Sequence, residues 1–477
     1  MVNFSLMADS PTKNQAQFAL EEICNATGGN PVNYRYDNDG TTVEGVVTDS
    51  RVFASEKDET SHLFVALRGE KFDGHKFLSE IVNQATAALV ETPDNELPLL
   101  QIQVPDTQKA LGDLANFHRK RFQIPVVAVT GSYGKTSTRA LIHAALSQKM
   151  KTLTSQANFN NEIGLPMTLF QLDAEHEAAV LEMGMRGRGQ IDYLSKIAQP
   201  TIGVLTNIGP QHLELLGSIE EIAAAKAELL ENLPENGLAI LPADSPFLPF
   251  LQSKTSCKLV TFGTAVWADY RVQNIETNAD GFIFCEINRE KIQLPLPGAH
   301  NAINAAAAFA VAREMGVEPQ KIKQGLESAQ LPGARMRVLK PENGITIIDD
   351  CYNAGPDSMR AALQTLLDFP GSGRKVAVLG AMKELGAASE TEHRKIGALA
   401  GQICEVLIGV GGETRPLLGN AIDSAKESEN EMQVSYCDDA SEAASRAGEW
   451  LQSGDVVLVK GSRSVGLEVF VEAVKAV

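Results

Sequence analysis

The segment Val126–Ser137, which reads V-V-A-V-T-G-S-Y-G-K-T-S, places phosphate-binding residue types between a buried strand and a helix. Gly131 and Gly134 would let backbone N–H groups approach phosphate oxygens, and a helix N-terminus adds partial positive charge. Lys135 would neutralise the β- and γ-phosphates, and the hydroxyl of Thr136 would bind Mg²⁺. The segment therefore predicts a nucleotide-binding loop.

The spacing of this loop is unusual, because its two glycines are closer together than in the common motif G-x-x-x-x-G-K-[ST]. A glycine turn that precedes a helix by chance is the alternative interpretation. The order of strand, Gly-Lys-Thr and helix favours the phosphate-binding one.

Two further polar residues follow buried strands. Glu182 ends the strand expected at 178–182, and His212 follows the strand expected at 201–206. Ligands of open α/β sheets bind at the carboxyl ends of strands, so both residues are candidates for a site and Glu182 for a Mg²⁺ ligand. A solvated strand-end acid and a structural histidine are the alternatives.

Lys226 lies on an expected helix whose same-face neighbours are Ile222, Ala223, Leu229 and Leu230. None of these is acidic, so no local ion pair accounts for the lysine. From the residues alone, the favoured interpretation is a lysine that lays its stem along the apolar stripe and extends its ammonium group to water.

The loop at 154–166 is rich in amides, with Asn158, Asn160 and Asn161. It predicts either a set of turns or a site for a polar substrate.

Cations and acids also follow strands in the last third of the chain. Asp350 ends a strand and could hold a ribose hydroxyl, unless it is a solvated acid. Lys460 and Arg463 flank a glycine after the last strand, where they could bind a carboxylate or phosphate or simply make the surface basic. Arg335 lies near an expected domain junction, where an exposed linker arginine is its alternative role.

The elements that position these residues alternate between strand and helix. Such alternation from residue 126 to about 330, and again from about 331, predicts mostly parallel sheets covered on both faces. Alternating short strands around 267–296 predict an antiparallel annex, and an alanine-rich helix is expected at 301–315. The fold class is therefore α/β.

Length and composition limit the classes of function. A chain of 477 residues predicts roughly three domains. A net charge of −18 argues against nucleic-acid and membrane-surface partners. The six scattered cysteines form no C-x-x-C pair and fit a reducing cytoplasm. Met1–Ser10 lacks the pattern of a signal peptide, and no apolar run is long enough to span a membrane.

Together these motifs resemble the Mur ligase family, the ATP-dependent amide-forming ligases of peptidoglycan synthesis. The short P-loop at 129–137 matches that of the family and explains the glycine spacing. The other matching motifs occur in the family's order along essentially the whole chain: N-N-E-I-G-L-P at 160–166, Glu182, His212, G-A-H-N at 298–301 and K-G-S-R at 460–463.

Within the family, the chain resembles the form that adds D-alanyl-D-alanine to UDP-N-acetylmuramoyl-tripeptide. D-D-C-Y-N-A-G-P at 349–356 resembles D-D-S-Y-N-A-N-P, and G-A-M-K-E-L-G at 380–386 resembles G-D-M-x-E-L-G. The D-N-P-R element of the diaminopimelate-adding form is absent. The departures Cys351, Gly355 and Ala381 put fine nucleotide and acceptor contacts in doubt, and the reaction class is unaffected.

The resemblance implies three domains: a small α/β UDP-sugar-binding domain at 1–122, a central P-loop-type ATP-binding domain at 123–330, and a Rossmann-like domain at 331–477 that binds the acceptor and part of the nucleotide. It also implies a monomer, and ATP and Mg²⁺ as cofactors. Lys226 matches a lysine that is carbamylated and helps to bind the second Mg²⁺, which reverses the interpretation from the residues alone.

The roles implied by the resemblance fall into four groups. The catalytic residues would be Lys135, His212 and Lys226. The nucleotide would contact Gly131, Ser132, Gly134, Lys135, Thr136, Ser137, Asn301, Arg335 and Asp350. The two other substrates would contact Asp49, Ser50, Arg51, His75, Asn160, Asn161, Asn353, Lys460 and Arg463. Mg²⁺ would be bound by Thr136, Glu182, His212 and carbamylated Lys226.

The implied reaction activates the tripeptide carboxylate as an acyl phosphate, which the amine of the dipeptide then attacks. A Mur-type ligase that adds a single amino acid, lysine or diaminopimelate, is the close alternative. A P-loop protein that hydrolyses ATP as a switch, without ligation, is the more distant one.

Overall fold

The computed structural model describes residues 14, 16–34, 40–55, 61–70, 72–156 and 158–476. Met1–Ser10, on which the expectation of no signal peptide depends, lies outside the described residues. The chain divides into two compact units. The first runs to Val126 and includes Lys151–Met183 and Asp192–Pro200, and the second contains Val127–Met150, Gly184–Ile191 and Thr201–Val477. The three-domain organisation stays a prediction.

The first unit is built from short strands and helices. They are β1 (Gln17–Ala19), α1 (Leu20–Thr27), β2 (Asn30–Val32), β3 (Thr42–Glu44), β4 (Val46–Val47), α2 (Arg51–Ser55), β5 (His62–Val65), η3 (Gly74–Phe77), α3 (Leu78–Ile81), β6 (Ala85–Val90), β7 (Leu100–Gln103), α4 (Thr107–Arg119), β9 (Thr152–Thr154), α6 (Gly164–Leu169), β10 (Ala178–Glu182) and α7 (Gln190–Ala198).

The sheet at the start of this unit has the order β2-β7-β6-β5-β4. Strands β4 to β7 are parallel, and β2 pairs antiparallel with β7. Side chains such as Phe64, Ile81 and Ala88 form its core. In the same unit, β1 pairs antiparallel with β3, and β9 pairs parallel with β10.

The second unit contains the glycine-rich loop and everything after residue 200. Its elements are β8 (Val126–Thr130), α5 (Lys135–Leu146), β11 (Ile202–Leu205), α8 (Leu213–Leu216), α9 (Ile219–Glu231), β12 (Leu238–Pro242), α10 (Leu248–Gln252), β13 (Lys258–Gly263), β14 (Tyr270–Thr277), β15 (Ile283–Ile287), β16 (Glu290–Leu294), α11 (Ala299–Glu314), α12 (Pro319–Glu327), β17 (Arg337–Leu339), β18 (Thr346–Asp349), α13 (Pro356–Asp368), β19 (Lys375–Gly380), η4 (Gly386–Ala388), α14 (Ser389–Ile403), β20 (Val406–Val410), η5 (Gly412–Thr414), α15 (Arg415–Glu427), β21 (Gln433–Cys437), α16 (Ala440–Ser445), α17 (Ala447–Trp450), β22 (Val456–Lys460), η6 (Arg463–Val465) and α18 (Glu468–Ala476).

Parallel strands carry the glycine-rich loop. In this unit they run in the order β14-β13-β12-β11-β8, and β15 and β16 continue antiparallel beyond β14, as expected for the annex. Helices α11 and α12 pack against α5, which follows the loop. Strand β8 is buried along its whole length, as is typical of a parallel strand with both faces covered.

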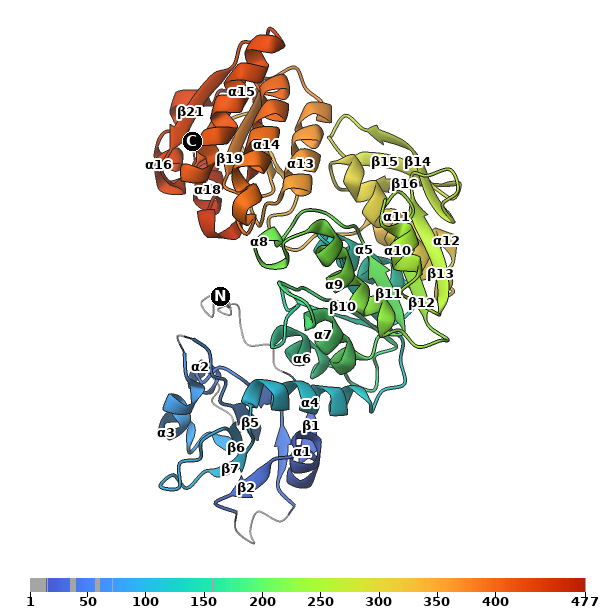
Figure 1. Cartoon of the computed structure of the whole chain (residues 1–477), viewed down its shortest axis with the longest axis vertical. Helices are drawn as coiled ribbons and strands as arrows, with labels where there is room; N and C mark the ends of the chain where they lie inside the picture. Colours follow the sequence, from blue (N-terminus) through green and yellow to red (C-terminus); the bar gives the residue numbers. More distant parts are fainter. Residues whose placement is uncertain are drawn as a thin grey trace. The chain divides into compact units, whose positions relative to one another are not determined.

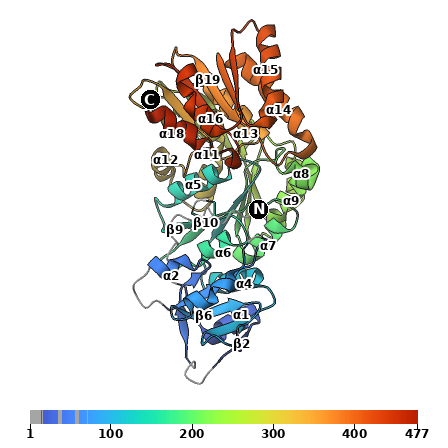
Figure 2. The ribbon, with the colours of Figure 1, turned by 90° about the vertical axis from the view of Figure 1, so that its left-hand side faces the viewer.

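The last sheet has the order β17-β18-β22-β19-β20-β21, and only β17 is antiparallel to its neighbour. Two apolar clusters cover its faces. One includes side chains of α13, α14 and α15, and the other includes side chains of α16, α17 and α18. The ribbons of α13, α14, α15, α16 and α18 can be followed in Figures 1 and 2. This doubly wound arrangement agrees with the predicted Rossmann-like pattern.

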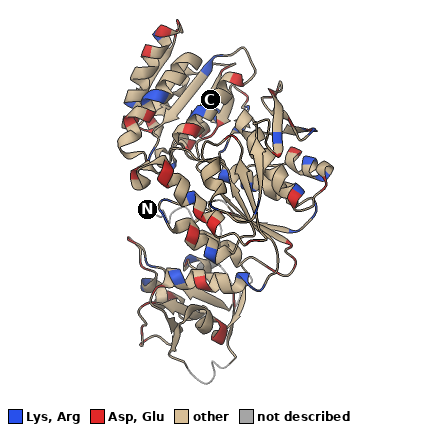
Figure 3. Ribbon diagram, turned by 45° about the vertical axis from the view of Figure 1, so that its right-hand side comes forward, with Lys and Arg blue, Asp and Glu red and all other residues tan. Residues whose placement is uncertain are grey.

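Lys, Arg, Asp and Glu residues lie mostly on helices and loops, whereas the strands are largely free of them (Figure 3). No helix among the described residues is both long enough and apolar enough to cross a bilayer. All six cysteines are free thiols.

Candidate active site

The predicted phosphate-binding turn lies between β8 and α5. Gly131 and Gly134 have φ angles of +150° and +76°, in the region that favours glycine. A Cβ at Gly131 would overlap the hydroxyl of Thr206, and one at Gly134 would lie 2.8 Å from Asn304 Oδ1. Helix α5 begins at Lys135, so the N–H groups of its first turn lie at the end of the glycine turn.

Two lysines converge on this turn. Lys135 Nζ donates to the carbonyl oxygen of Gly131 at 2.8 Å, and Lys226 Nζ donates to the same oxygen at 3.0 Å. Lys226 is only 1% exposed, so the interpretation in which its ammonium group reaches water is wrong. Burial, with a smaller effect from the charge of Lys135, lowers the pKa of Lys226 well below its usual value.

Helix α9 accounts for the position of Lys226. The side chain of Ser218 caps the helix by accepting from the N–H of Glu221. Ala227 and Leu230 pack into a core with Leu205 of β11 and Leu241 of β12. Lys226 lies on this buried side of α9, so its side chain points into the protein.

His212 lies at the start of α8 with a left-handed φ of +58°. Its Nδ1 is 2.6 Å from Glu384 Oε2, and Glu384 Oε1 is 3.6 Å from Arg186. Burial lowers the pKa of His212, the hydrogen bond to Glu384 opposes this, and the charges of Lys135 and Lys226 lower it further. The neutral imidazole therefore donates from Nδ1 and keeps a lone pair on Nε2.

The first unit contains a separate polar group at the end of β10. Asn160 Nδ2 donates to Glu182 Oε1 at 2.8 Å, and the hydroxyl of Ser155 accepts from the N–H of Glu182 at 3.2 Å. Asn161 Oδ1 accepts from the N–H of Gly164, the first residue of α6, at 2.8 Å. The structure thus joins Asn160 to Glu182 and gives Asn161 a local partner.

The predicted UDP-binding residues have partners within the same unit. Arg51 forms a two-point ion pair with Asp49, whose pKa it lowers. Ser50 precedes α2, and its carbonyl accepts from the N–H of Phe53 at 3.2 Å.

His75 is held from both ring nitrogens. Its Nδ1 lies 2.7 Å from Asp73 Oδ1, and its Nε2 accepts from the N–H of Glu91 at 2.9 Å. These partners fix a neutral ring with the proton on Nδ1.

Asp350 and Lys460 meet although 110 residues separate them. Lys460 Nζ donates to Asp350 Oδ2 at 2.5 Å and to the carbonyl of Asn353 at 2.9 Å, and Asp350 Oδ1 accepts from the N–H of Met336. Asp350 is 8% exposed and Lys460 is 2% exposed. The alternatives of a solvated acid and a basic surface are therefore wrong for this pair.

Two arginines face one aromatic ring next to this pair. The guanidinium of Arg335 lies 3.6 Å from the ring centroid of Tyr352, and that of Arg463 lies 5.9 Å from it. Arg335 also donates to the carbonyl of Pro332 at 2.7 Å, and Arg463 pairs with Glu468.

Three other predicted nucleotide contacts are buried. Thr136 and Ser137 lie in the first turn of α5, and Asn301 lies in the first turn of α11. Asn301 Nδ2 donates to the carbonyl of Pro297, and its Oδ1 accepts from Asn304 Nδ2 at 3.1 Å.

The three departures from the family pattern have structural roles. Cys351 is 1% exposed and packs in the core beside β18, and burial raises the pKa of its thiol. Ala381 is also 1% exposed, and its carbonyl accepts from the N–H of Ser462. A Cβ at Gly355 would lie 2.7 Å from Gln211 Nε2, so the glycine makes room for that side chain.

Two features of the site were missed from sequence. Asn207 holds the glycine turn with its side-chain amide, and Glu384 binds His212. Asn207 lies in the T-N-I-G segment that follows a strand, so its strand-end position was the available signal. Glu384 lies in the motif G-A-M-K-E-L-G at 380–386, which resembled the family pattern but to which no chemical role was assigned.

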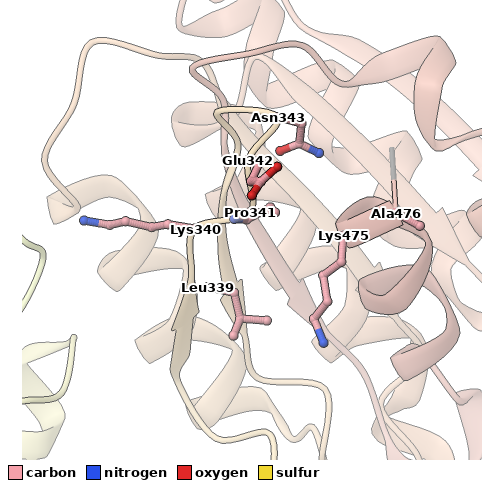
Figure 4. Close-up of a pocket in the computed structure, with 7 residues that line it drawn as sticks. All are labelled: Leu339, Lys340, Pro341, Glu342, Asn343, Lys475 and Ala476. Atoms are coloured by element: carbon pink, nitrogen blue, oxygen red, sulfur yellow. The ribbon is translucent and has the colours of Figure 1, made fainter.

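The described residues contain no group of three or more His, Cys, Asp or Glu side chains that could hold a metal ion. A pocket of about 680 Å³ lies elsewhere, beside the turn between β17 and β18 and the end of α18, and is lined by Lys340, Asn343 and Lys475 among others (Figure 4). None of the predicted site residues lines it.

Known proteins share both the motifs and the fold. Residues 129–312 match the Mur ligase middle domain, and residues 334–463 match the glutamate ligase domain of the Mur ligases. The chain is 36% identical to UDP-N-acetylmuramoyl-tripeptide–D-alanyl-D-alanine ligase of Bacillus subtilis over 95% of its own length and 97% of that protein. This chain belongs to the Mur ligase family.

Other Mur ligases are similar over most of the chain. The enzyme of the same name from Synechocystis sp. is 39% identical, with 89% of this chain and 90% of that protein covered. MurF from Acinetobacter baumannii superposes with a TM-score of 0.87 at 32% identity, over 97% of this chain and all of that one. MurF from Thermotoga maritima in complex with ADP superposes with a TM-score of 0.78 at 28% identity, over 90% of this chain and 97% of that one. The chain is an ATP-dependent ligase, as the sequence predicted.

Proposed function

We propose that this Mur ligase joins D-alanyl-D-alanine to UDP-N-acetylmuramoyl-tripeptide and forms ADP and phosphate. The observation that carries the proposal is the extent of the likeness. The two matched family domains cover residues 129–312 and 334–463, whereas the likeness to the tripeptide–D-alanyl-D-alanine ligase of Bacillus subtilis covers 95% of the chain. It therefore includes most of the first 128 residues, where the sequence predicts the UDP-sugar site.

The nucleotide would bind at the glycine turn. Backbone N–H groups at the start of α5 and the ammonium group of Lys135 supply positive charge for the triphosphate. In the described structure Lys135 donates to two carbonyl oxygens of its own loop, those of Gly131 and Ser132, which phosphate oxygens would replace. Arg335 and Asp350, near the start of the last sheet, would add contacts to the phosphates and the ribose.

Two of the donor types proposed for Mg²⁺ suit a hard cation, because the hydroxyl of Thr136 and the carboxylate of Glu182 supply oxygen, and the imidazole of His212 would add a nitrogen. The lowered pKa of Lys226 favours the neutral amine, which is the form that reacts with carbon dioxide to give a carbamate. A carbamate would add an anionic oxygen donor. When bound, Mg²⁺ would neutralise charge on the phosphates.

The reaction proposed for these residues has two steps. An oxygen of the tripeptide's terminal carboxylate attacks the γ-phosphorus, and ADP leaves. The amine of D-alanyl-D-alanine then attacks the acyl carbon, loses a proton and displaces phosphate. Phosphoryl transfer of this kind depends on positioning and charge neutralisation, which Lys135 and the α5 N-terminus would provide.

The other substrates would bind outside the glycine turn. Asp49, Ser50, Arg51 and His75 would contact the UDP-sugar, with Asn160 and Asn161 near its peptide. Asn353, Lys460 and Arg463 would contact the dipeptide acceptor. These assignments correspond to three domains at 1–122, 123–330 and 331–477. Because its substrates and ATP are intracellular, we assign the enzyme to the cytoplasm, and we expect a monomer.

A coupled ADP-release assay separates this proposal from its alternatives. The protein is mixed with ATP and UDP-linked muramyl tripeptide, and then with D-alanyl-D-alanine, lysine or diaminopimelate. We expect ADP release that depends on the dipeptide. Turnover that requires a single amino acid would support the other Mur-type activity, and ATP hydrolysis that no amine stimulates would support a switch.

A further inference from the structure

The loop that follows β11 holds the glycine turn through several hydrogen bonds. Asn207 Oδ1 accepts from the N–H of Tyr133 at 3.0 Å, and Asn207 Nδ2 donates to the carbonyl of the same residue at 2.9 Å. The hydroxyl of Thr206 donates to that carbonyl as well, at 2.7 Å. One residue of the turn is thus held by both of its backbone polar groups.

Ser132, one residue earlier in the turn, forms hydrogen bonds in both directions with the same loop. The hydroxyl of Ser132 donates to the carbonyl of Gly209 at 2.9 Å and accepts from the N–H of Gly209 at 2.9 Å. The N–H of Ser132 donates to the carbonyl of Asn207 at 3.1 Å. Ser132 is 2% exposed and Thr206 is 5% exposed, so water competes little for these bonds.

These bonds fix which amides of the turn can face a phosphate. The N–H groups of Ser132 and Tyr133 already donate to Asn207, so an anion would be bound by other groups of the turn, among them the N–H groups at the start of α5. The side-chain amide of Asn207 supplies both a donor and an acceptor to the backbone of Tyr133, as the hydroxyl of Ser132 does for Gly209.

We propose that Asn207 is a positioning residue for nucleotide binding, which acts by holding the peptide of Tyr133 and hence the shape of the glycine turn. The inference rests on the proposed use of residues 131–136 for phosphate binding. The same loop continues to His212, so one segment of backbone sets the position of the turn and of that imidazole together.

The test compares two asparagines whose side chains each donate to one backbone carbonyl and accept from one backbone N–H. Asn343 donates to the carbonyl of Val474 at 2.8 Å and accepts from the N–H of Ile345 at 3.1 Å, but it lines the pocket of Figure 4, away from the predicted site. The variants Asn207→Ala and Asn343→Ala of the full chain therefore lose equivalent hydrogen bonds. ADP binding is measured by calorimetry, melting temperature by circular dichroism, and KM for ATP and for the UDP-linked tripeptide by steady-state kinetics.

We expect Asn207→Ala to weaken ADP binding and to raise KM for ATP by about 10- to 100-fold, because the part-buried N–H of Tyr133 loses its partner and the carbonyl of Tyr133 keeps only the hydroxyl of Thr206. KM for the UDP-linked tripeptide should change by less than about twofold, and Asn343→Ala should leave all three constants near those of the unaltered protein.

Equal ADP affinity in Asn207→Ala and the unaltered protein would overturn the inference and leave the proposed function standing. An unaltered protein that binds no ADP would overturn the proposed function itself. If Asn207→Ala does not fold, Asn207→Asp replaces it, since it keeps the acceptor and the size but sets a carboxylate oxygen against the carbonyl of Tyr133. The same weakening of ADP binding is expected, and its absence would again overturn the inference.

Discussion

Lys135 and Lys226 donate to one and the same carbonyl oxygen, that of Gly131, at 2.8 and 3.0 Å. One lysine begins the helix after the glycine turn, and the other comes from the buried side of α9, 91 residues further along the chain. Two ammonium groups would repel each other at this oxygen. The structure resolves the conflict by burying Lys226, which favours its neutral form.

Replacing Lys135 tests the role of its positive charge. Lys135→Ala should lower kcat/KM for ATP by at least about 100-fold, because a charge that stabilises phosphoryl transfer is lost. Lys149→Ala is the control, since Lys149 also donates to a backbone carbonyl of a loop, that of Gly316, at 2.9 Å. Activity of Lys135→Ala within about threefold of that of the control would contradict the assignment.

Lys226→Met tests whether the buried amine takes part in the reaction. The unbranched methionine fills most of the space of the lysine stem, lacks the amine and can remain in the buried position, so we expect a folded protein whose ligation is reduced at least about 100-fold. A melting temperature close to that of the unaltered protein establishes folding. Crystals grown with bicarbonate should also show density beyond Nζ of Lys226. Near-normal turnover of Lys226→Met would contradict the mechanism.

His118 should make the first unit sensitive to acid. Its ring lies among Phe18, Phe122 and Phe170, its Nε2 donates to the carbonyl of Leu172 at 3.1 Å, and its Nδ1 has no hydrogen-bond partner among the described residues. Burial lowers its pKa to about 4, whereas an unfolded histidine titrates near 6.5. The unfolded chain therefore binds the extra proton first. The stabilisation is fully present above about pH 6.5 and is lost as the pH falls toward 4.

Urea unfolding at pH 7.5 and pH 4.5 measures this effect. His118→Gln should lose less free energy of unfolding between the two pH values than the unaltered protein does, by about 2–3 kcal/mol. The half-exposed His143 provides the control variant His143→Gln. An identical pH dependence of unfolding in His118→Gln and the unaltered protein would rule out His118 as the cause.

Cys351→Ser tests the meaning of the departures from the family pattern. Because the thiol lies in the core beside β18, the change should leave kcat and the three KM values within about twofold. Burying a hydroxyl there should cost about 1–2 kcal/mol of stability. A large change in KM for the dipeptide, measured by the ADP-release assay, would instead place this residue at the acceptor site.

The parts of the site that the sequence predicted are local in the chain. The glycine turn depends on residues 126–137, whose strand, glycines and helix start are adjacent, and the structure shows each of them in place. The pattern of buried strands also predicted that four polar residues would lie at or after the carboxyl ends of strands. The structure agrees, since Glu182 and Lys460 end β10 and β22, and Asp350 and His212 come after β18 and β11.

What the sequence could not supply is the order of strands and the direction of side chains. Asp350 meets Lys460 because the last strand, β22, inserts between β18 and β19, and periodicity does not determine that order. The direction of Lys226 depends on which side of α9 packs on β11 and β12. The apolar stripe around Lys226 was compatible both with an ammonium group that reaches water and with a buried amine. Asn207 carried no motif of its own, and its role emerges only from the approach of β11 to β8.

The most direct test of the central claim is product analysis by mass spectrometry after the protein is mixed with ATP, UDP-N-acetylmuramoyl-tripeptide and D-alanyl-D-alanine. The account predicts a UDP-linked pentapeptide, with ADP and phosphate formed in equal amounts. ATP hydrolysis that leaves both peptides unjoined, or ligation only of a single amino acid, would contradict it.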